Sequence, residues 1–139
     1  MTVESINFNQ NLKTYAINGD ESNIVKINTA DYGIFDRADK AKAILAELSN
    51  RANNATTDNA FTELSEIDKE VKEQLNYVFG TDVSTPAFGT ANCLSPVNGE
   101  PMFLGFFNAL LRIISHDIES ATKKMAEGVK KYTHQLPKA

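Results

Sequence analysis

Residues 101–133 read PMFLGFFNALLRIISHDIESATKKMAEGVKKYT, and this stretch decides the fold. Apolar side chains recur through it every three or four residues, which is the spacing of one face of an α-helix. Pro101 suits the first turn of such a helix, where its missing amide hydrogen is not needed. We therefore predict a long C-terminal helix at the centre of the fold, with an apolar face made of Phe103, Phe106, Phe107, Leu110, Ile114, Ile118, Ala121, Met125, Val129 and Tyr132.

Two shorter helices are predicted before it. The first starts near Thr29 or Asp31, because either side chain can cap a helix. Its apolar face is Ile34, Phe35, Ala38, Ala41, Leu45 and Leu48. The second runs from about Asp58 to Phe79, and Gly80 is its expected C-terminal cap. Its apolar face is Phe61, Leu64, Ile67, Val71, Leu75 and Val78.

Residues 12–28 have the pattern of a β-hairpin. Two runs of strand-forming residues, 12–17 and 23–27, flank the pair Asn18-Gly19. Asn-Gly is a strong hairpin signal because both residues tolerate the positive φ of a type I′ turn. An isolated hairpin is only marginally stable in water, so we expect this one to pack on the helices or to pair with another chain.

The expected fold class is therefore α+β and mainly α, with an N-terminal hairpin followed by three main helices. A chain of 139 residues is the size of one domain. Within it, residues 1–28 form the hairpin segment and residues 29–139 the helical body. The connection over residues 80–101 is rich in glycine and proline and has no predicted element. Long connections of this kind are often functional.

Composition argues against several classes of protein. The net charge of −4 and the pI near 5.2 disfavour a dedicated nucleic-acid binder, which needs a basic face. The N-terminus lacks the basic and apolar regions of a signal peptide, and no apolar run reaches the length of a membrane span. One cysteine cannot form an intrachain disulfide. We expect a soluble cytosolic protein.

The charge is unevenly distributed along the chain. Residues 58–100 hold eight acidic and two basic side chains, whereas residues 101–139 hold three acidic and six basic ones. This asymmetry is consistent with head-to-tail contacts between copies. The alternative interpretation is that the basic end only complements the C-terminus of the last helix.

No catalytic, cofactor-binding or metal-ligating residue is predicted. His116 and His134 are 18 residues apart, which is outside zinc-ligand spacing. His116 and Asp117 are adjacent on a predicted helix and do not face each other. Cys93 could act as a nucleophile only with a nearby base, so a small buried apolar residue is the favoured interpretation. An enzyme is the least favoured class.

The aromatic start of the last helix has two interpretations. Phe103, Phe106 and Phe107 belong either to a core helix that is buried on two sides or to an interface with a partner, where large aromatic residues are common. The hairpin adds a second candidate surface, because a two-stranded sheet leaves backbone groups unpaired at its edge. The predicted interaction residues are Phe103, Phe106, Phe107, Ile24 and Ile27.

Several short motifs follow one another in a familiar order. Asn18-Gly19-Asp20 in the hairpin is followed by YVFG at residues 77–80, AFGTAN at 87–92, NGEP at 98–101, FLGFFNAL at 103–110 and KKYT at 130–133. Over about residues 14–133, this order resembles small proteins encoded in the tail modules of long-tailed bacteriophages and prophages of Gram-positive bacteria. Some of those proteins look like tail assembly chaperones.

The resemblance implies a non-enzymatic, chaperone-like binder of tape measure or tail tube subunits. Such a protein would act in the bacterial host cytoplasm, tend to form oligomers and need no cofactor, nucleic acid or membrane. The alternative is a structural component of the virion, such as a tail or connector protein. A phage-encoded inhibitor of a host protein is a third, weaker possibility.

Overall fold

The computed structural model describes the backbone of residues 2–55 and 59–135, and side chains as far as residue 129. The predicted class, α+β with mainly helix, is confirmed. In chain order the elements are β1 (Lys13–Ile17), β2 (Asp20–Ile27), α1 (Gly33–Asn53), α2 (Ala60–Phe79), α3 (Ser84–Phe88), β3 (Pro96–Val97), β4 (Glu100–Pro101) and α4 (Met102–Gln135).

The predicted N-terminal hairpin forms, but its second strand begins at Asp20, three residues before the predicted run. β1 and β2 pair antiparallel, with Tyr15 opposite Val25, and the register shifts between Ala16 and Ile17. The chain turns at Asn18 and Gly19, whose φ angles of 51° and 78° lie in the left-handed region that this pair tolerates. Val25 and Ile27 of β2 are buried, and they attach the sheet to the core.

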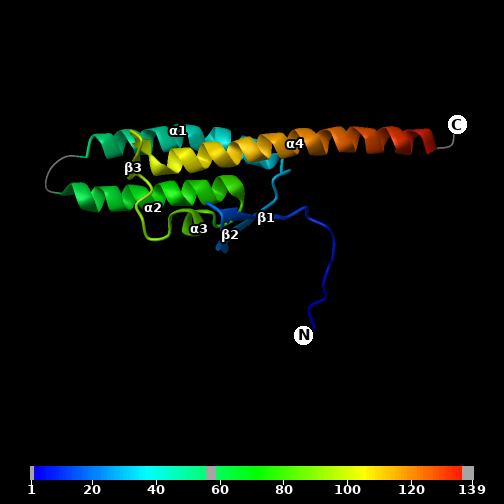
Figure 1. Cartoon of the computed structure of the whole chain (residues 1–139), viewed down its shortest axis with the longest axis horizontal. Helices are drawn as coiled ribbons and strands as arrows, with labels where there is room; N and C mark the ends of the chain where they lie inside the picture. The colour runs from blue at the N-terminus through cyan, green and yellow to red at the C-terminus, as the bar shows by residue number, and fades with distance from the viewer. Residues whose placement is uncertain (1, 56–58, 136–139) are drawn as a thin grey trace.

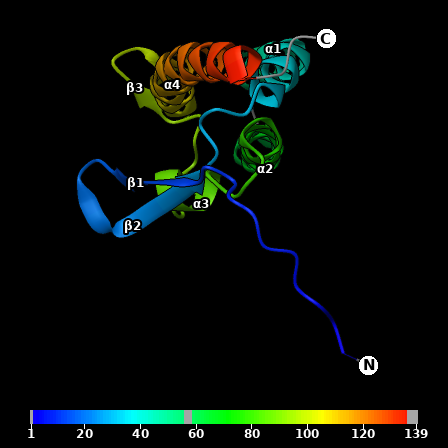
Figure 2. The same cartoon turned by 90° about the vertical axis from the view of Figure 1, so that its right-hand side faces the viewer.

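The long helices and the hairpin surround one core. α1 and α4 lie side by side, α2 lies beneath them, and the hairpin with α3 lies below α4 (Figures 1 and 2). The apolar faces of the helices meet in the middle, as their periodicity predicts. The core residues are Val25, Ile27, Ile34, Ala38, Ala41, Leu45, Leu48, Ile67, Val71, Leu75, Val78, Phe79, Val83, Phe88, Cys93, Phe103, Phe107, Leu110 and Ile114.

Two phenylalanines predicted for apolar faces are exposed instead. Phe61 is 90% exposed, because the first turn of α2 extends past the start of α4 (Figure 1). Phe35 is 39% exposed. Its neighbour Ile34 is buried, and adjacent helical residues point about 100° apart, so only one of the two can face the core.

The predicted start of the first helix also needs correction. α1 begins at Gly33, and Thr29 does not cap it, because the Thr29 hydroxyl donates to Asp117 instead. Asp31 does cover this end, accepting the Gly33 N–H at 2.8 Å and pairing with Arg37 at 2.8 Å. Asp58, the predicted start of the second helix, lies outside the described residues.

The connection over residues 80–101 contains three short elements that were not predicted, namely α3, β3 and β4. Gly80 ends α2 in the left-handed conformation, as predicted, and α3 follows it. The side chain of Asn76 on α2 accepts the N–H groups of Val83 and Ser84 at 2.9 and 3.0 Å, which fixes the start of α3. A second tight turn at Asn98-Gly99 joins β3 to β4.

The last helix is continuous, but its two halves have different surroundings. α4 extends well beyond the ends of α1 and α2 (Figure 1). Asp117 and Thr122 make side-chain hydrogen bonds to Thr29 and Tyr32, in the segment between β2 and α1. Beyond them Met125 is 55% exposed, so the apolar face belongs to the core only in the first half. In the described part of the chain, every helix is too short or too polar to cross a bilayer.

Candidate functional site

The first half of α4 has two apolar faces. Phe103, Phe107, Leu110 and Ile114 point into the core. A neighbouring face, made by residues at the same three- and four-residue spacing, borders a groove instead. The α4 residues on this second face are Met102, Gly105, Phe106, Ala109, Leu110 and Ile113.

Strand β1 forms the opposite wall of the groove. Four consecutive residues, Tyr15 to Asn18, line it, whereas β2 contributes only Val25. Tyr15, Ala16 and Ile17 belong to β1, and Asn18 belongs to the turn that follows it. Neighbouring side chains of a strand point to opposite faces, so lining by both Tyr15 and Ala16 means that the groove reaches the backbone edge of the strand. β1 pairs only with β2 in a two-stranded sheet, so its other edge has no strand partner within residues 2–55 and 59–135.

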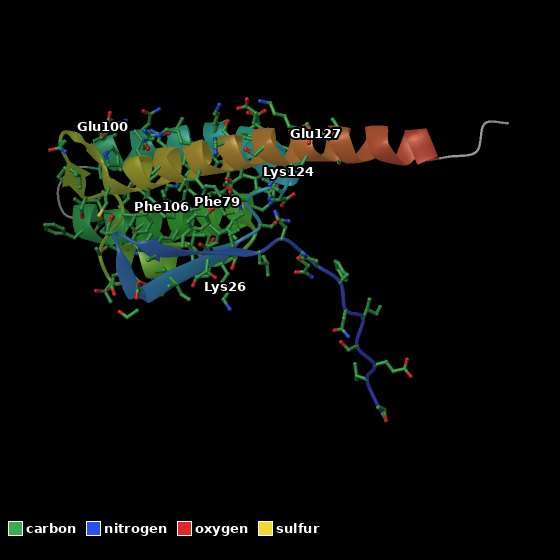
Figure 3. All side chains as sticks on the ribbon, turned by 45° about the vertical axis from the view of Figure 1, so that its right-hand side comes forward. Lys26, Phe79, Glu100, Phe106, Lys124 and Glu127 are labelled. Atoms are coloured by element: carbon green, nitrogen blue, oxygen red, sulfur yellow. The ribbon has the colours of Figure 1, made fainter. Side chains whose placement is uncertain are left out.

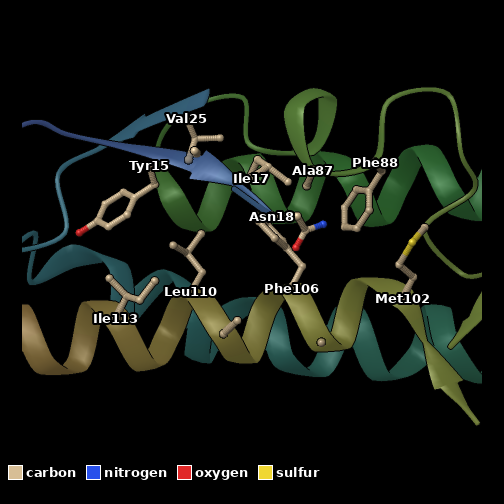
Figure 4. Close-up of a pocket in the computed structure, with 13 residues that line it drawn as sticks. Tyr15, Ile17, Asn18, Val25, Ala87, Phe88, Met102, Phe106, Leu110 and Ile113 are labelled. Carbon is tan, nitrogen blue, oxygen red and sulfur yellow. The ribbon is translucent and has the colours of Figure 1, made fainter. Parts of the chain in front are cut away.

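Aromatic side chains close one end of the groove. Phe106 meets Phe79 of α2 (Figure 3) and Phe88 of α3 (Figure 4) in edge-to-face geometry, with ring centroids 6.4 and 5.5 Å apart. Ala87 and Phe88 of α3 complete the lining (Figure 4). The volume is about 350 Å³, near the lower end of the range for ligand pockets. The groove can hold a few side chains, and a whole helix would not fit in it.

Asp117 joins the two walls at the other end. One carboxylate oxygen accepts hydrogen bonds from the hydroxyls of Thr29 and Tyr15, at 2.5 and 3.1 Å, and pairs with the ammonium of Lys13 at 3.1 Å. The bond from Thr29, with those from Lys13 and Tyr15, holds the pKa of Asp117 below its usual value. This cluster therefore fixes β1 relative to α4.

A further contact fixes the hairpin relative to α3. The side-chain amide of Asn23 on β2 donates to the Pro86 carbonyl at 2.5 Å. The three walls of the groove are thus tied to one another by side-chain hydrogen bonds. A preformed groove loses less conformational entropy when it binds than a floppy one does.

The sequence analysis named the hairpin edge and the aromatic start of the last helix as candidate surfaces, and the groove lies between these two elements. Among the five predicted interaction residues, only Phe106 lines it. Phe103 and Phe107 are 3% and 5% exposed, so these two residues follow the first interpretation, a core helix, and do not form an exposed interface patch. They face the core because they lie on the face of α4 that packs between α1 and α2.

The two hairpin residues also lie elsewhere. Ile27 is 1% exposed and belongs to the core, whereas Ile24 is 42% exposed and does not line the groove. Sequence reasoning missed Tyr15, Ile17 and Ala109. One signal could have found the groove: Gly105 and Ala109 are small, lie four residues apart, and flank Phe106 on one helix face.

Cys93 is placed as its favoured interpretation requires. It is fully buried, and burial together with the nearby Asp68 carboxylate raises the pKa of its thiol to about 12. Its N–H donates to the Asp68 side chain at 2.8 Å, while Lys72 bonds both Asp68 and the Ala91 carbonyl. These contacts anchor the loop before β3 on α2.

The remaining residues considered for a catalytic role are His116, Asp117 and His134. His116 is exposed, and the Asp117 carboxylate is engaged by Thr29, Tyr15 and Lys13. His134 has a side chain outside the described residues. Among the residues that the structure describes, three or more metal-ligating side chains gather nowhere.

An apolar groove beside a free strand edge can accept an extended segment of another chain. The segment would add a strand through backbone hydrogen bonds and place alternate side chains in the groove. Comparisons with protein-family models, with curated proteins and with solved structures found no match to this chain. Its function has to be inferred from the groove and its lining.

Proposed function

We propose that the chain is a non-enzymatic binding protein of phage tail assembly that holds an extended, apolar segment of a tape measure or tail tube subunit. The observation that carries the proposal is the groove, which combines the edge of β1 with an apolar face of α4. The tail context rests on the sequence resemblance over residues 14–133. The groove supports the binding role independently of that resemblance.

The groove suits a transient, sequence-tolerant contact. Strand addition uses backbone groups, which every partner sequence supplies, and leaves selection to the side chains that enter the groove. The lining around Phe106, Met102 and Ile113 is apolar, so it selects apolar side chains. An assembly chaperone has to hold such segments of an unassembled subunit and then release them.

A charge in the groove tests this proposal. Ala109→Glu places a carboxylate on the exposed α4 face that lines the groove, and Ser120→Glu is the matched control on an exposed position of the same helix. Binding to the tape measure and tail tube proteins of the same phage would be measured by calorimetry, with circular dichroism as a folding check. We expect Ala109→Glu to weaken binding more than tenfold and Ser120→Glu to leave it unchanged. Equal binding by both variants would contradict the proposal.

The projecting half of α4 favours a second candidate, a structural component of the virion tail or connector. A long helix with exposed apolar residues such as Met125 suits a permanent contact within a larger assembly. Mass spectrometry of purified particles separates the two candidates. Stoichiometric presence of the chain would favour the structural component, and its absence would favour the chaperone.

A further inference from the structure

The segment before β1 carries apolar side chains that contact little of the body. Residues 2–12 form no helix or strand and run away from the hairpin (Figures 1 and 3). We call this segment the arm. Val3, Ile6 and Phe8 are 89%, 88% and 71% exposed. Large apolar side chains exposed together often indicate a contact site.

The arm has the sequence pattern of a half-buried strand. Ser5-Ile6-Asn7-Phe8-Asn9 alternates polar and apolar residues without a break. In a strand this alternation places Ile6 and Phe8 on one face and the three polar residues on the other. The hydrogen bonds within the arm are local, from Ser5 to Asn7 and from Asn11 to Asn9. A strand pattern is therefore present without a strand partner.

The groove along β1 has the complementary requirements. It lies along the unpaired edge of β1, where Tyr15, Ala16 and Ile17 line it, and the alternating part of the arm is long enough to cover these three residues. It is apolar on the side that two alternate side chains of an added strand would enter. Its outer side faces solvent, where Ser5, Asn7 and Asn9 would remain hydrated.

We propose that the arm of one copy of the chain lies in the groove of a second copy, with residues 5–9 added antiparallel to β1. Ile6 and Phe8 enter the groove beside Phe106, and the second copy returns its own arm to the first. This inference rests on the proposed role of the groove as an acceptor of extended segments. It identifies a second copy of this chain as one occupant.

The direction of the arm favours exchange between copies. The arm leaves the hairpin on the side away from α3 and the first turns of α4 (Figure 1), and these elements line the groove, so we expect the arm to meet the groove of a neighbouring copy. The five arm residues that pair with β1 and the thirteen residues that line the groove give each copy 18 interface residues, so the interface is a small one. Standard stable interfaces use about 20–30 residues on each side.

Arm exchange would make self-association and partner binding mutually exclusive. Both occupants need the same strand edge and the same apolar lining. The dimer then keeps the groove covered until an apolar segment of a tail subunit displaces the arm. Adding that subunit should convert the dimer to a complex that contains one copy of the chain.

Two adjacent substitutions test the proposal in the full chain. Phe8→Asp places a charge on the arm face that enters the groove, and Asn7→Asp places the same charge on the face that remains in solvent. Light scattering coupled to gel filtration would measure dimer dissociation. We expect Phe8→Asp to weaken the dimer by about 10- to 100-fold, the effect of losing one buried large apolar side chain. We expect Asn7→Asp to leave it unchanged. Equal behaviour of the two variants would overturn the proposal.

An engineered disulfide can show where the arm binds. The variant with both Phe8→Cys and Ala109→Cys should form a bond between two chains on mild oxidation, and the variant with Asn7→Cys and Ala109→Cys should form far less. Cys93 is buried and does not compete. A bond within one chain would show that the arm folds back on its own groove, and absence of any bond would show that it binds elsewhere. Either result overturns arm exchange.

The failure of this inference can be told apart from failure of the proposed function. A chain that stays monomeric, but whose binding to tail proteins is weakened by Ala109→Glu, overturns arm exchange and leaves the proposed function standing. A dimer disrupted by Phe8→Asp, in a chain that binds no tail protein, supports arm exchange and overturns the tail-binding role.

Discussion

The two halves of α4 share one sequence periodicity but differ in what covers it. In the first half Phe103, Phe107 and Ile114 are buried against α1 and α2. In the second half the same spacing continues through Met125, which is more than half exposed. The border between them lies at Asp117 and Thr122, which bond to Thr29 and Tyr32 in the segment between β2 and α1.

The difference shows what helical periodicity can and cannot specify. Periodicity determines which side chains share a face of a helix. It does not determine whether another element is long enough to cover that face. α1 and α2 are 21 and 20 residues long and α4 is 34, so α4 extends beyond them. Met125 on the projecting half is therefore accessible for contacts with other molecules.

Truncating one apolar side chain in each half should give the largest contrast. Phe107 is buried and its ring lies 5.9 Å from that of Phe79, so Phe107→Ala should lower the free energy of unfolding by about 3–5 kcal/mol. Met125→Ala should change it by less than about 0.5 kcal/mol. Urea unfolding followed by circular dichroism measures both. Similar losses would mean that the projecting half packs against another copy in solution.

Removing the Asp117 carboxylate should lower the free energy of unfolding by an intermediate amount. Asp117→Ala leaves the fully buried Thr29 hydroxyl without its acceptor, and we expect a loss of about 1–3 kcal/mol. Glu119→Ala, two residues further along, removes an exposed carboxylate and should cost less than about 0.5 kcal/mol. Hydrogen exchange should become faster in β1 only for Asp117→Ala. Unchanged exchange there would show that the cluster does not hold the hairpin.

Low pH should weaken the contacts that Asp117 makes with Thr29, Tyr15 and Lys13. The pKa of Asp117 is lowered in the folded chain, so its contribution to stability is complete above the unfolded value of about 3.9 and is lost as the pH falls through the folded value. Asp117→Asn cannot lose a charge, and its urea midpoint should therefore fall less than that of the wild type between pH 7 and pH 3. Parallel pH profiles for the two chains would rule out a role for this carboxylate.

A matched pair of glycine substitutions should give the smallest effects. Gly105 and Gly128 both lie in α4, and a Cβ added at either meets nothing within 4 Å. Gly105→Ala should raise the free energy of global unfolding by about 0.5–1 kcal/mol, the difference in helix propensity. Gly128→Ala should stabilise only the projecting half, which opens locally, and should leave global unfolding unchanged. Equal global effects would mean that the whole helix unfolds as one unit.

Local signals explain what the sequence predicted correctly. The hairpin follows from Asn18-Gly19, because the turn needs positive φ at both residues. The end of α2 follows from Gly80, which adopts the left-handed conformation there. In both cases the physical cause lies within a few residues of the element that it defines.

Long-range contacts explain what the sequence did not reveal. α3 is held by Asn76, and the loop around Cys93 is held by Asp68, so both depend on side chains of another helix. Thr29 is a residue type that often caps the N-terminus of a helix, but its hydroxyl donates to Asp117, 88 residues later in the chain. The groove could not be predicted without knowing which face of α4 packs beside the hairpin. The resemblance to tail proteins contains no such geometric information.

The burial of Cys93 has a practical consequence for spectroscopy. It is the only cysteine in the chain, and with a thiol pKa of about 12 it is almost entirely protonated at the pH of common labelling reactions. A cysteine introduced on the arm or on the projecting half of α4 can therefore carry a fluorophore or a spin label without removal of the native residue. In the wild-type chain, a thiol reagent can react with Cys93 only when the loop around this residue detaches from α2. The rate of that reaction therefore measures how often this part of the core opens.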